Sequence, residues 1–375
     1  MHICIVHRDI HQVTRGGICT LNRALAACLA ARGHQVTVIT QATPHPIRAL
    51  DAELVTLPRT SDLTAHRRAV TAALTAISPD VIDCSTWEAE TLDYLQIPAS
   101  HRAPVVVRGD LSARTMGAAV LAAAESDLVH LADRVIAVSA FASRDVAAAY
   151  RIRAPQVICN GVDSNRFCPG PVLAPRSGYR VTLDRDGQAT GHESLPGLLA
   201  SRIPVPPWTP DQDGLPQLAW VGKITPMKGW DYLETLTRQL RDIARITILL
   251  GHSGARCPVT LSGRNGPVIL QDLDDCDLAG FYRAADWLLC TSRWEGFGLA
   301  IAEALACGTP ALLPAGLGVA PELLAVGGGL TYQDIAHLAR ILAIRPRPPG
   351  KLPAEFDWDA NAEATLAVYH GLITR

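Results

Sequence analysis

The stretch SRWEGFGLAIAEALACGTP, residues 292–310, runs from the end of an apolar segment through a glycine-bearing turn into an alanine-rich segment with helical spacing. This order predicts a strand, a tight turn and a helix. Gly296 and Gly298 leave room for a ligand at the helix start, where unpaired backbone N–H groups attract anions. Glu295 and Glu303 flank that start, and a carboxylate such as Glu303 can accept two hydrogen bonds from a ribose diol. The alternative is an ordinary strand–helix turn with two surface glutamates.

The stretch LAWVGKITPMKGWDYL, residues 218–233, places two lysines around a short loop. A strand is predicted to end at Gly222, and Lys223 and Lys228 follow before the next helix. Two cations at such a strand end can hold a diphosphate and stabilise the charge that develops as it leaves. Two lysines in a loop are also commonly solvated, and the glycine–lysine order of an ATP-type phosphate loop is absent.

Apolar β-branched runs alternate with alanine- and leucine-rich helical patterns on both sides of residues 169–214. The alternation predicts doubly wound parallel sheets with helices on both faces. Residues 169–214 are rich in proline and glycine, carry a D-G hairpin signal, and are predicted to link two domains. Strands are expected at 3–7, 35–40, 81–83, 105–108, 134–139 and 156–160, and again at 218–222, 246–251, 267–270, 286–291 and 309–313.

The blocks VGK…KG and EGFGLAIAE resemble those of the retaining glycosyltransferases of glycosyltransferase family 4, and the resemblance extends over nearly the whole chain. ADRVIAVS (132–139), NGVDSNRFCP (160–169) and FDWDANAEATLAVY (356–369) also carry it. The resemblance implies an α/β fold of the GT-B type, in which two Rossmann-like, doubly wound parallel-sheet domains face each other across a cleft. The implied domains are an acceptor-binding domain, 1–168 completed by a helix at 357–375, and a nucleotide-sugar-binding domain, 215–356.

The resemblance also implies roles for single residues. Lys223 and Lys228 would contact the diphosphate, Glu295 the donor sugar and Glu303 the ribose, with Lys223 standing where an arginine is commoner. The predicted catalytic residues are Lys223, Lys228, Glu295 and Asp110. The other implied donor-binding residues belong to glycine-bearing turns: Gly16, Gly17, Gly222, Phe297, Gly298 and Leu299. The implied reaction moves a hexose, N-acetylglucosamine or glucose, from a UDP-sugar with retention, with no metal ion and no cofactor besides the donor substrate.

Asp110 ends the segment PVVVRGD (104–110), where many family members carry a histidine close to the reacting sugar. This aspartate is predicted either to stand in that position or only to cap a helix. Carboxylates also gather in DCSTWEAETLDYL (83–95), just after a predicted strand, where α/β sheets bind ligands. The predicted acceptor-binding residues are Asp83, Trp87, Glu88, Arg108 and Asp110.

These carboxylates favour a cationic acceptor, and Trp87 could pack against the face of its ring. The two segments resemble those of aminoglycoside-pathway glycosyltransferases, which act on the aminocyclitol 2-deoxystreptamine. That acceptor, in antibiotic biosynthesis, is therefore the predicted one. The alternatives are a lipid or polysaccharide acceptor, a phosphorylase or epimerase of the same fold, and a non-catalytic nucleotide-sugar-binding protein.

The charge balance excludes one broad class of function. The 375 residues carry 34 basic and 36 acidic side chains, a net charge of −2, which argues against a general nucleic-acid binder. The ten cysteines form no C-x-x-C pair, no charged leader precedes the first apolar run, and no run reaches the roughly 18 to 20 apolar residues of a membrane span. A cytoplasmic protein with small-molecule partners and no stable membrane insertion is expected.

The aspartates of DLDDCDL (272–278) are predicted to start a helix.

Overall fold

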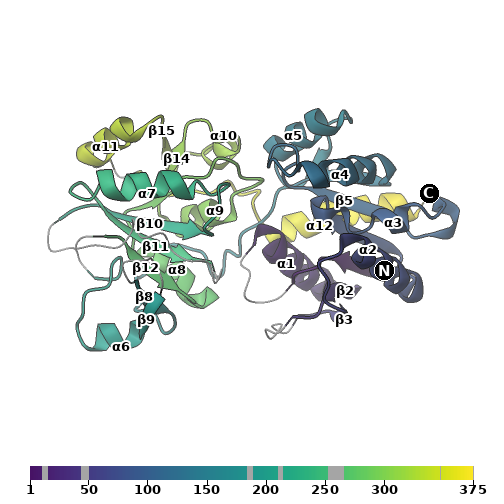
Figure 1. Cartoon of the computed structure of the whole chain (residues 1–375), viewed down its shortest axis with the longest axis horizontal. Helices are drawn as coiled ribbons and strands as arrows, with labels where there is room; N and C mark the ends of the chain where they lie inside the picture. Colours follow the sequence, from purple (N-terminus) through teal and green to yellow (C-terminus); the bar gives the residue numbers. More distant parts are fainter. Residues whose placement is uncertain are drawn as a thin grey trace. The chain divides into compact units, whose positions relative to one another are not determined.

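A computed structural model of the chain (Figure 1) describes residues 1–10, 16–43, 50–183, 189–209, 214–251, 266–346 and 348–374. The chain divides into two compact units, Met1–Gly161 with Glu355–Arg375, and Val162–Ala354. It therefore passes from the first unit into the second and returns to the first through its last helix. None of the helices within the described ranges is long and apolar enough to cross a membrane.

The first unit is built on a seven-stranded sheet in the order β3-β2-β1-β4-β5-β6-β7, and all neighbouring strands are parallel. Ile3 and Ile5 of the central strand pack into one core, whereas Cys4 and Val6 pack into another on the opposite face. Both faces are thus covered, as expected for apolar strands in a parallel sheet. The strands are β1 (His2–Val6), β2 (Gln35–Gln41), β3 (Glu53–Leu57), β4 (Val81–Ser85), β5 (Val105–Gly109), β6 (Arg134–Ala137) and β7 (Gln156–Val157).

Helices and two short 3-10 turns connect these strands: α1 (Gly17–Ala31), α2 (Leu63–Ile77), η1 (Trp87–Ala89), α3 (Leu92–Leu95), η2 (Ala99–His101), α4 (Ala119–Leu131) and α5 (Ala140–Tyr150). The last helix, α12 (Trp358–Ile373), also belongs to this unit, and Figure 1 shows it beside α1. Its start is capped by Asp357, whose carboxylate accepts from the N–H groups of Asp359 and Ala360 at 2.9 and 3.1 Å.

The second unit is built on an eight-stranded sheet in the order β15-β14-β13-β10-β11-β12-β8-β9. The strands from β15 to β12 are parallel, and β8 and β9 complete the sheet in antiparallel pairing. The strands are β8 (Tyr179–Leu183), β9 (Ala189–Ser194), β10 (Gln217–Gly222), β11 (Arg245–Leu250), β12 (Val268–Gln271), β13 (Trp287–Leu289), β14 (Ala311–Pro314) and β15 (Gly329–Tyr332). The helices are α6 (Leu195–Ala200), α7 (Trp230–Gln239), α8 (Asp275–Arg283), α9 (Leu299–Ala306), α10 (Ala320–Leu323) and α11 (Ile335–Ile344).

Two parallel-sheet α/β units are therefore present, as the alternating pattern predicted. The hairpin expected in 169–214 is present as β8 and β9, but the segment does more than link the units. It is not a free linker: β8 pairs with β12 through Arg180 and Leu270, β9 pairs with β8, and α6 follows. The first unit also ends at Gly161, before the expected position of residue 168. The D-G turn of the expected hairpin lies outside the described residues.

The strand order indicates which end of each sheet to examine for a ligand site. β1 has β2 on one side and β4 on the other, and β10 likewise lies between β11 and β13. Chain connections leave such a central strand in opposite directions, and α/β sheets generally bind ligands at the carboxyl ends of the strands there. In the second unit this edge carries Lys223, Lys228 and Glu295, and in the first it carries Trp87 and Asp110.

Candidate active site

Two loops meet at the carboxyl ends of β10 and β13 in the second unit. Residues 223–229 follow β10, and residues 290–298 follow β13. Arg293 joins them, because its backbone N–H donates to the Met227 carbonyl at 2.9 Å and its Nη1 donates to the Pro226 carbonyl at 2.8 Å. Thr291 Oγ1 donates to the Lys228 carbonyl at 2.8 Å. The two stretches that predicted a ligand site are therefore adjacent.

Lys228 and Glu295 form the charged centre of this pair of loops. Lys228 Nζ donates to Glu295 Oε1 at 2.6 Å, and Ser292 Oγ donates to the same oxygen at 2.6 Å. The side chains of Lys228 and Glu295 are 22% and 12% exposed, so most of their surface is buried while a small part still contacts solvent. Burial alone would lower the pKa of Lys228, but the Glu295 carboxylate outweighs it and raises that pKa above its ordinary value. Lys228 is therefore a fixed cation.

Gly229 explains how the loops approach so closely. Its φ is +62°, and a Cβ there would lie 2.0 Å from the Thr291 carbonyl oxygen. Gly222, at the end of β10, faces the Trp220 ring, which a Cβ would meet at 2.6 Å. Lys223 comes next and is half-buried. A side chain at Gly229 would force the lysine loop away from the loop after β13, and one at Gly222 would clash with the Trp220 ring of its own strand.

The glycine turn after β13 leads into α9. Gly298 has φ +87° and precedes the helix without any side-chain cap, while Phe297 is buried beneath the turn. The N–H groups of Leu299 and Ala300 lie in the first turn, where a helix offers them no acceptor. This geometry provides donors for a phosphate or sugar oxygen at the helix start. Phe297, Gly298 and Leu299 all lie in this turn, and their donor-binding role stays a prediction.

Glu303 lies one turn into α9 and is half-buried. Its Oε2 accepts a hydrogen bond from the Tyr282 hydroxyl at 2.9 Å. Tyr282 belongs to α8 and is fully buried, so this bond from the core fixes the orientation of the Glu303 carboxylate. The structure thus joins Glu295 to Lys228 and Glu303 to Tyr282, and the two glutamates are held by different parts of the fold.

In the first unit, the structure corrects the prediction that Asp83 and Arg108 bind the acceptor. Asp83 is 0% exposed, and Arg108 Nε donates to its two oxygens at 2.8 and 3.0 Å. Tyr369 of α12 donates to Asp83 at 2.6 Å, and Thr365 accepts from Arg108 Nη2 at 3.0 Å. Burial alone would lower the pKa of Arg108, but Asp83 raises it above its ordinary value. This ion pair therefore belongs to the core and fastens α12 to the sheet.

Glu88 also has an internal partner. Arg8 Nη1 donates to both of its carboxylate oxygens at 3.0 Å, and Arg67 Nη2 donates to its backbone carbonyl at 2.6 Å. Glu88 and Ala89 adopt φ values of +61° and +49°, which are strained for residues with side chains. Trp87, half-exposed, begins this turn. The two arginines hold the strained turn in place, and strain of this kind commonly marks a functional site.

Sequence patterns missed the polar groups that surround this turn. Glu90 is buried; its Oε2 contacts His66 Nε2 at 2.8 Å and its Oε1 lies 3.8 Å from His7 Nδ1. Burial would raise the pKa of Glu90, but the His66 hydrogen bond and the nearby His7 lower it to about 2. Ser85 Oγ and His7 Nδ1 are buried without a hydrogen-bond partner among the described residues. Ser85 is the last residue of β4, and His7 directly follows β1, the neighbouring strand. In the sequence, only this position at the end of a strand indicates that they could belong to a site.

Asp110 follows β5 and does not cap a helix, because residues 113–117 form turns and α4 begins only at Ala119. The loop after it is held by two carboxylates from neighbouring helices. Asp145 Oδ2 accepts from the Ser112 N–H at 2.7 Å, and Glu125 Oε2 accepts from the Ala113 N–H at 2.9 Å. The position of Asp110 thus depends on Glu125 and Asp145.

Gly16 caps α1 through its backbone position, and Gly17 begins that helix; residues 11–15 of the glycine loop lie outside the described residues.

Glu125 gives this loop a pH dependence. Burial raises the pKa of Glu125 to about 7, although hydrogen bonds from Tyr150 and the Ala113 N–H lower it. The folded chain keeps the proton up to about pH 7, whereas the unfolded chain releases it near 4.5, so the free energy of unfolding falls as the pH rises between these values. In Glu125→Gln, which has no proton to release here, the decrease in the free energy of unfolding over this pH range should be smaller by about 3 kcal/mol. Urea unfolding across this pH range measures it, with exposed Glu363→Gln as the control; an unchanged slope in Glu125→Gln would contradict the raised pKa.

Comparison with known proteins assigns both units. Residues 15–166 match the model of Glycosyltransferase Family 4, and residues 209–334 match that of the glycosyl transferases group 1. Each unit thus contains a segment that matches a glycosyltransferase family model. The matches agree with the resemblance of the sequence blocks at the level of glycosyltransferase domains, while the aminoglycoside subgroup stays a prediction.

Relatives of these glycosyltransferase units include a D-inositol 3-phosphate glycosyltransferase of Kineococcus radiotolerans. It is 26% identical over 324 residues, which cover 76% of this chain and 66% of that protein. The chain thus spans slightly less than two thirds of that relative's length.

Solved structures show the fold. Sucrose-phosphate synthase from Thermosynechococcus elongatus superposes with a TM-score of 0.74 at 19% identity, covering 100% of this chain and 99% of the other. Anabaena HepE, solved with UDP and glucose, has a TM-score of 0.62 at 18% identity, covering 99% and 97% of the two chains. The expected GT-B fold of the glycosyltransferase units is confirmed.

Proposed function

We propose that the chain is a retaining glycosyltransferase that moves a hexose from a UDP-sugar to a small hydroxylated acceptor. The observation that carries the proposal is the Lys228–Glu295 pair beside the uncapped start of α9, at the carboxyl edge of the second sheet. A fixed cation and free helix N–H groups suit a diphosphate, and a carboxylate next to them suits sugar hydroxyls. The family matches support the reaction class, and the likeness to a protein solved with UDP and glucose supports UDP-hexose as the first donor to test.

The proposed mechanism gives each residue one task. Lys228, assisted by Lys223, stabilises the negative charge that develops on the diphosphate as the bond to the sugar breaks. Glu295, held by Ser292 and Lys228, accepts a hydroxyl hydrogen bond from the hexose. The leaving diphosphate takes the proton of the acceptor hydroxyl on the same face of the sugar, so the configuration is retained without a protein nucleophile. In this proposal the lysines provide the charge that a metal ion would otherwise supply.

The structure changes the basis for choosing the acceptor. Asp83 is enclosed in the core, and Glu88 and Glu90 already have cationic or histidine partners, so the carboxylates offer less to a dication such as 2-deoxystreptamine. The Ser85 hydroxyl at the end of β4, which has no hydrogen-bond partner among the described residues, fits a hydroxyl group instead. We therefore propose an acceptor of the cyclitol class, with 2-deoxystreptamine as one arm of the test.

The decisive experiment is a screen of UDP- and dTDP-sugars against neutral cyclitols, inositol phosphates and 2-deoxystreptamine, read by mass spectrometry. A product that gains one hexose only when an acceptor is present supports the proposal. Turnover of the donor without any acceptor would instead indicate a phosphorylase or epimerase. Donor binding without turnover of any pair would indicate a nucleotide-sugar-binding protein.

Glu303 should act mainly on donor binding. Glu303→Gln removes a charged acceptor from the ribose diol, and a hydrogen bond to a charged group contributes about 1.5 to 3 kcal/mol. We expect the donor KM to rise about ten- to a hundredfold with kcat nearly unchanged, because ribose contacts differ little between ground and transition states. Tyr282→Phe, which removes the hydroxyl that orients Glu303, should give a smaller rise. A large fall in kcat at unchanged donor KM would contradict this role.

A further inference from the structure

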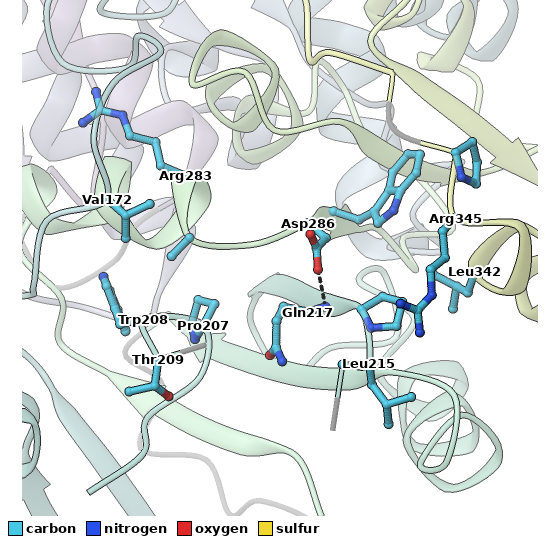
Figure 2. A pocket seen from close by; sticks show the side chains of 15 residues that line it. Val172, Pro207, Trp208, Thr209, Leu215, Gln217, Arg283, Asp286, Leu342 and Arg345 are labelled. Atoms are coloured by element: carbon cyan, nitrogen blue, oxygen red, sulfur yellow. Dashed lines mark hydrogen bonds between the residues drawn. The ribbon is translucent and has the colours of Figure 1, made fainter. Parts of the chain in front are cut away.

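A pocket lies at the amino-terminal edge of the second unit's sheet (Figure 2). Its volume is about 430 Å³, and residues at the starts of β10 and β13, among them Gln217 and Trp287, line it. Lys228 and Glu295 follow the opposite ends of the same two strands. The length of β10 alone, roughly 16 Å at the usual rise per residue, separates the pocket from the candidate active site. The two places are therefore distinct.

Gln217 makes this pocket unusual. Its side chain lines the pocket and the residue is only 7% exposed, yet neither its amide oxygen nor its amide nitrogen has a hydrogen-bond partner among the described residues. Its backbone N–H, in contrast, donates to Asp286 Oδ2 at 2.9 Å, as the dashed line in Figure 2 shows. A buried polar group without a partner lowers stability, so it calls for an explanation. A ligand that both donates to and accepts from the amide provides one.

The other groups around the pocket define the ligand's chemistry. In Figure 2, Trp208 and Arg345 lie on either side of Gln217, with Asp286 close by. Arg283 also lines the pocket, but its guanidinium already donates to the Cys168 carbonyl at 2.8 Å. Of the remaining charges, the Asp286 carboxylate repels an anion and the Arg345 guanidinium repels a cation. A hydroxyl group suits both, because it donates to a carboxylate and accepts from a guanidinium or an amide.

We propose that this pocket binds a neutral sugar of one or two pyranose units. The C–H face of a pyranose ring packs against an indole such as Trp208, while its hydroxyls pair with Gln217, Asp286 and Arg345. The volume lies within the range of small-molecule sites. The site goes beyond the proposed transfer reaction, because none of its residues belongs to the candidate active site.

The test is calorimetric titration of the whole chain, without donor, with glucose and with maltose. The wild-type chain should bind one of the two saturably, and Gln217→Met should weaken that binding about tenfold or more through loss of the amide hydrogen bonds. Methionine matches glutamine in length and has no unpaired polar atom, so the midpoint of thermal unfolding should stay the same or rise. Glu303→Gln, in the candidate active site, is the matched control and should leave sugar binding within twofold.

Four results would overturn the proposal. The first is the absence of saturable binding of either sugar to the wild-type chain. The second is binding that Gln217→Met leaves intact, and the third is binding that Glu303→Gln abolishes, which would place the sugar in the active site. The fourth is tighter binding of glucose 1-phosphate than of glucose, which would contradict a neutral ligand. Because none of these measurements needs turnover, failure here and failure of the proposed reaction can be told apart.

Discussion

Replacing Lys228 with alanine is expected to lower kcat for sugar transfer by about a hundredfold or more. The ammonium is already fixed by Glu295 at 2.6 Å, so it can stabilise the leaving diphosphate with little rearrangement. Removing one such preorganised charge-stabilising group costs about 3 kcal/mol in the transition state. Rapid-quench measurement with both substrates saturating isolates the chemical step.

Two further variants separate charge stabilisation from general damage at Lys228. Lys228→Arg keeps the charge and should retain more activity than alanine, though a planar guanidinium cannot reproduce the same contact with Glu295. Lys351→Ala removes an exposed lysine of the same unit and should stay within twofold of the wild type. A kcat close to that of the wild type in Lys228→Ala, in a folded protein, would remove the diphosphate role from this residue.

Replacing Asp83 with alanine should have the largest effect on stability. It leaves the Arg108 guanidinium, 2% exposed, without its carboxylate inside the first unit. Breaking a buried ion pair from one side costs about 3 to 5 kcal/mol. Hydrogen exchange followed by mass spectrometry should show faster exchange of the β4 and β5 amides, by roughly two to four orders of magnitude where exchange requires opening of this unit.

The controls for Asp83 use one exposed pair and one paired substitution. Asp359→Ala breaks the Arg32–Asp359 pair, whose side chains are 31% and 75% exposed, and should change exchange little. The double variant Asp83→Leu with Arg108→Met leaves no buried charge and should recover much of the lost protection. If the β4 and β5 amides of Asp83→Ala stayed as protected from hydrogen exchange as those of the wild type, and the acceptor KM rose instead, the acceptor role predicted from the sequence would be restored.

Local patterns predicted most of the two sheets, because parallel strands buried on both faces appear in the sequence as continuous apolar runs. They missed β3, whose residues Glu53 to Leu57 are mostly exposed at a sheet edge and form no such run. They indicated the hairpin in 169–214 but not its pairing with the second sheet, because the contact of β8 with β12 joins residues about ninety positions apart. Nothing local in either segment specifies that contact.

The same limit applies to the candidate site. The spacing of Glu295 and Glu303 and the glycines around α9 indicated the second unit's site, because a turn and its helix are local structures. Distant residues determine whether the carboxylates of residues 83–95 are available to a ligand. Arg8 pairs with Glu88 across 80 positions of the sequence, and Tyr369 bonds to Asp83 across 286. A carboxylate after a strand suggests a ligand until its long-range partner is known.

The return of the chain through α12 has a consequence for biosynthesis. Tyr369 and Thr365 complete the Asp83–Arg108 pair, yet they follow the whole of residues 162–354 in the order of translation. At about 5 to 20 residues per second, a ribosome needs roughly 10 to 40 s to make that intervening unit. During this interval the nascent first unit holds a buried ion pair whose last hydrogen-bonding partners have not yet been synthesised. The second unit, whose sequence is continuous, can finish folding first, although its synthesis begins later.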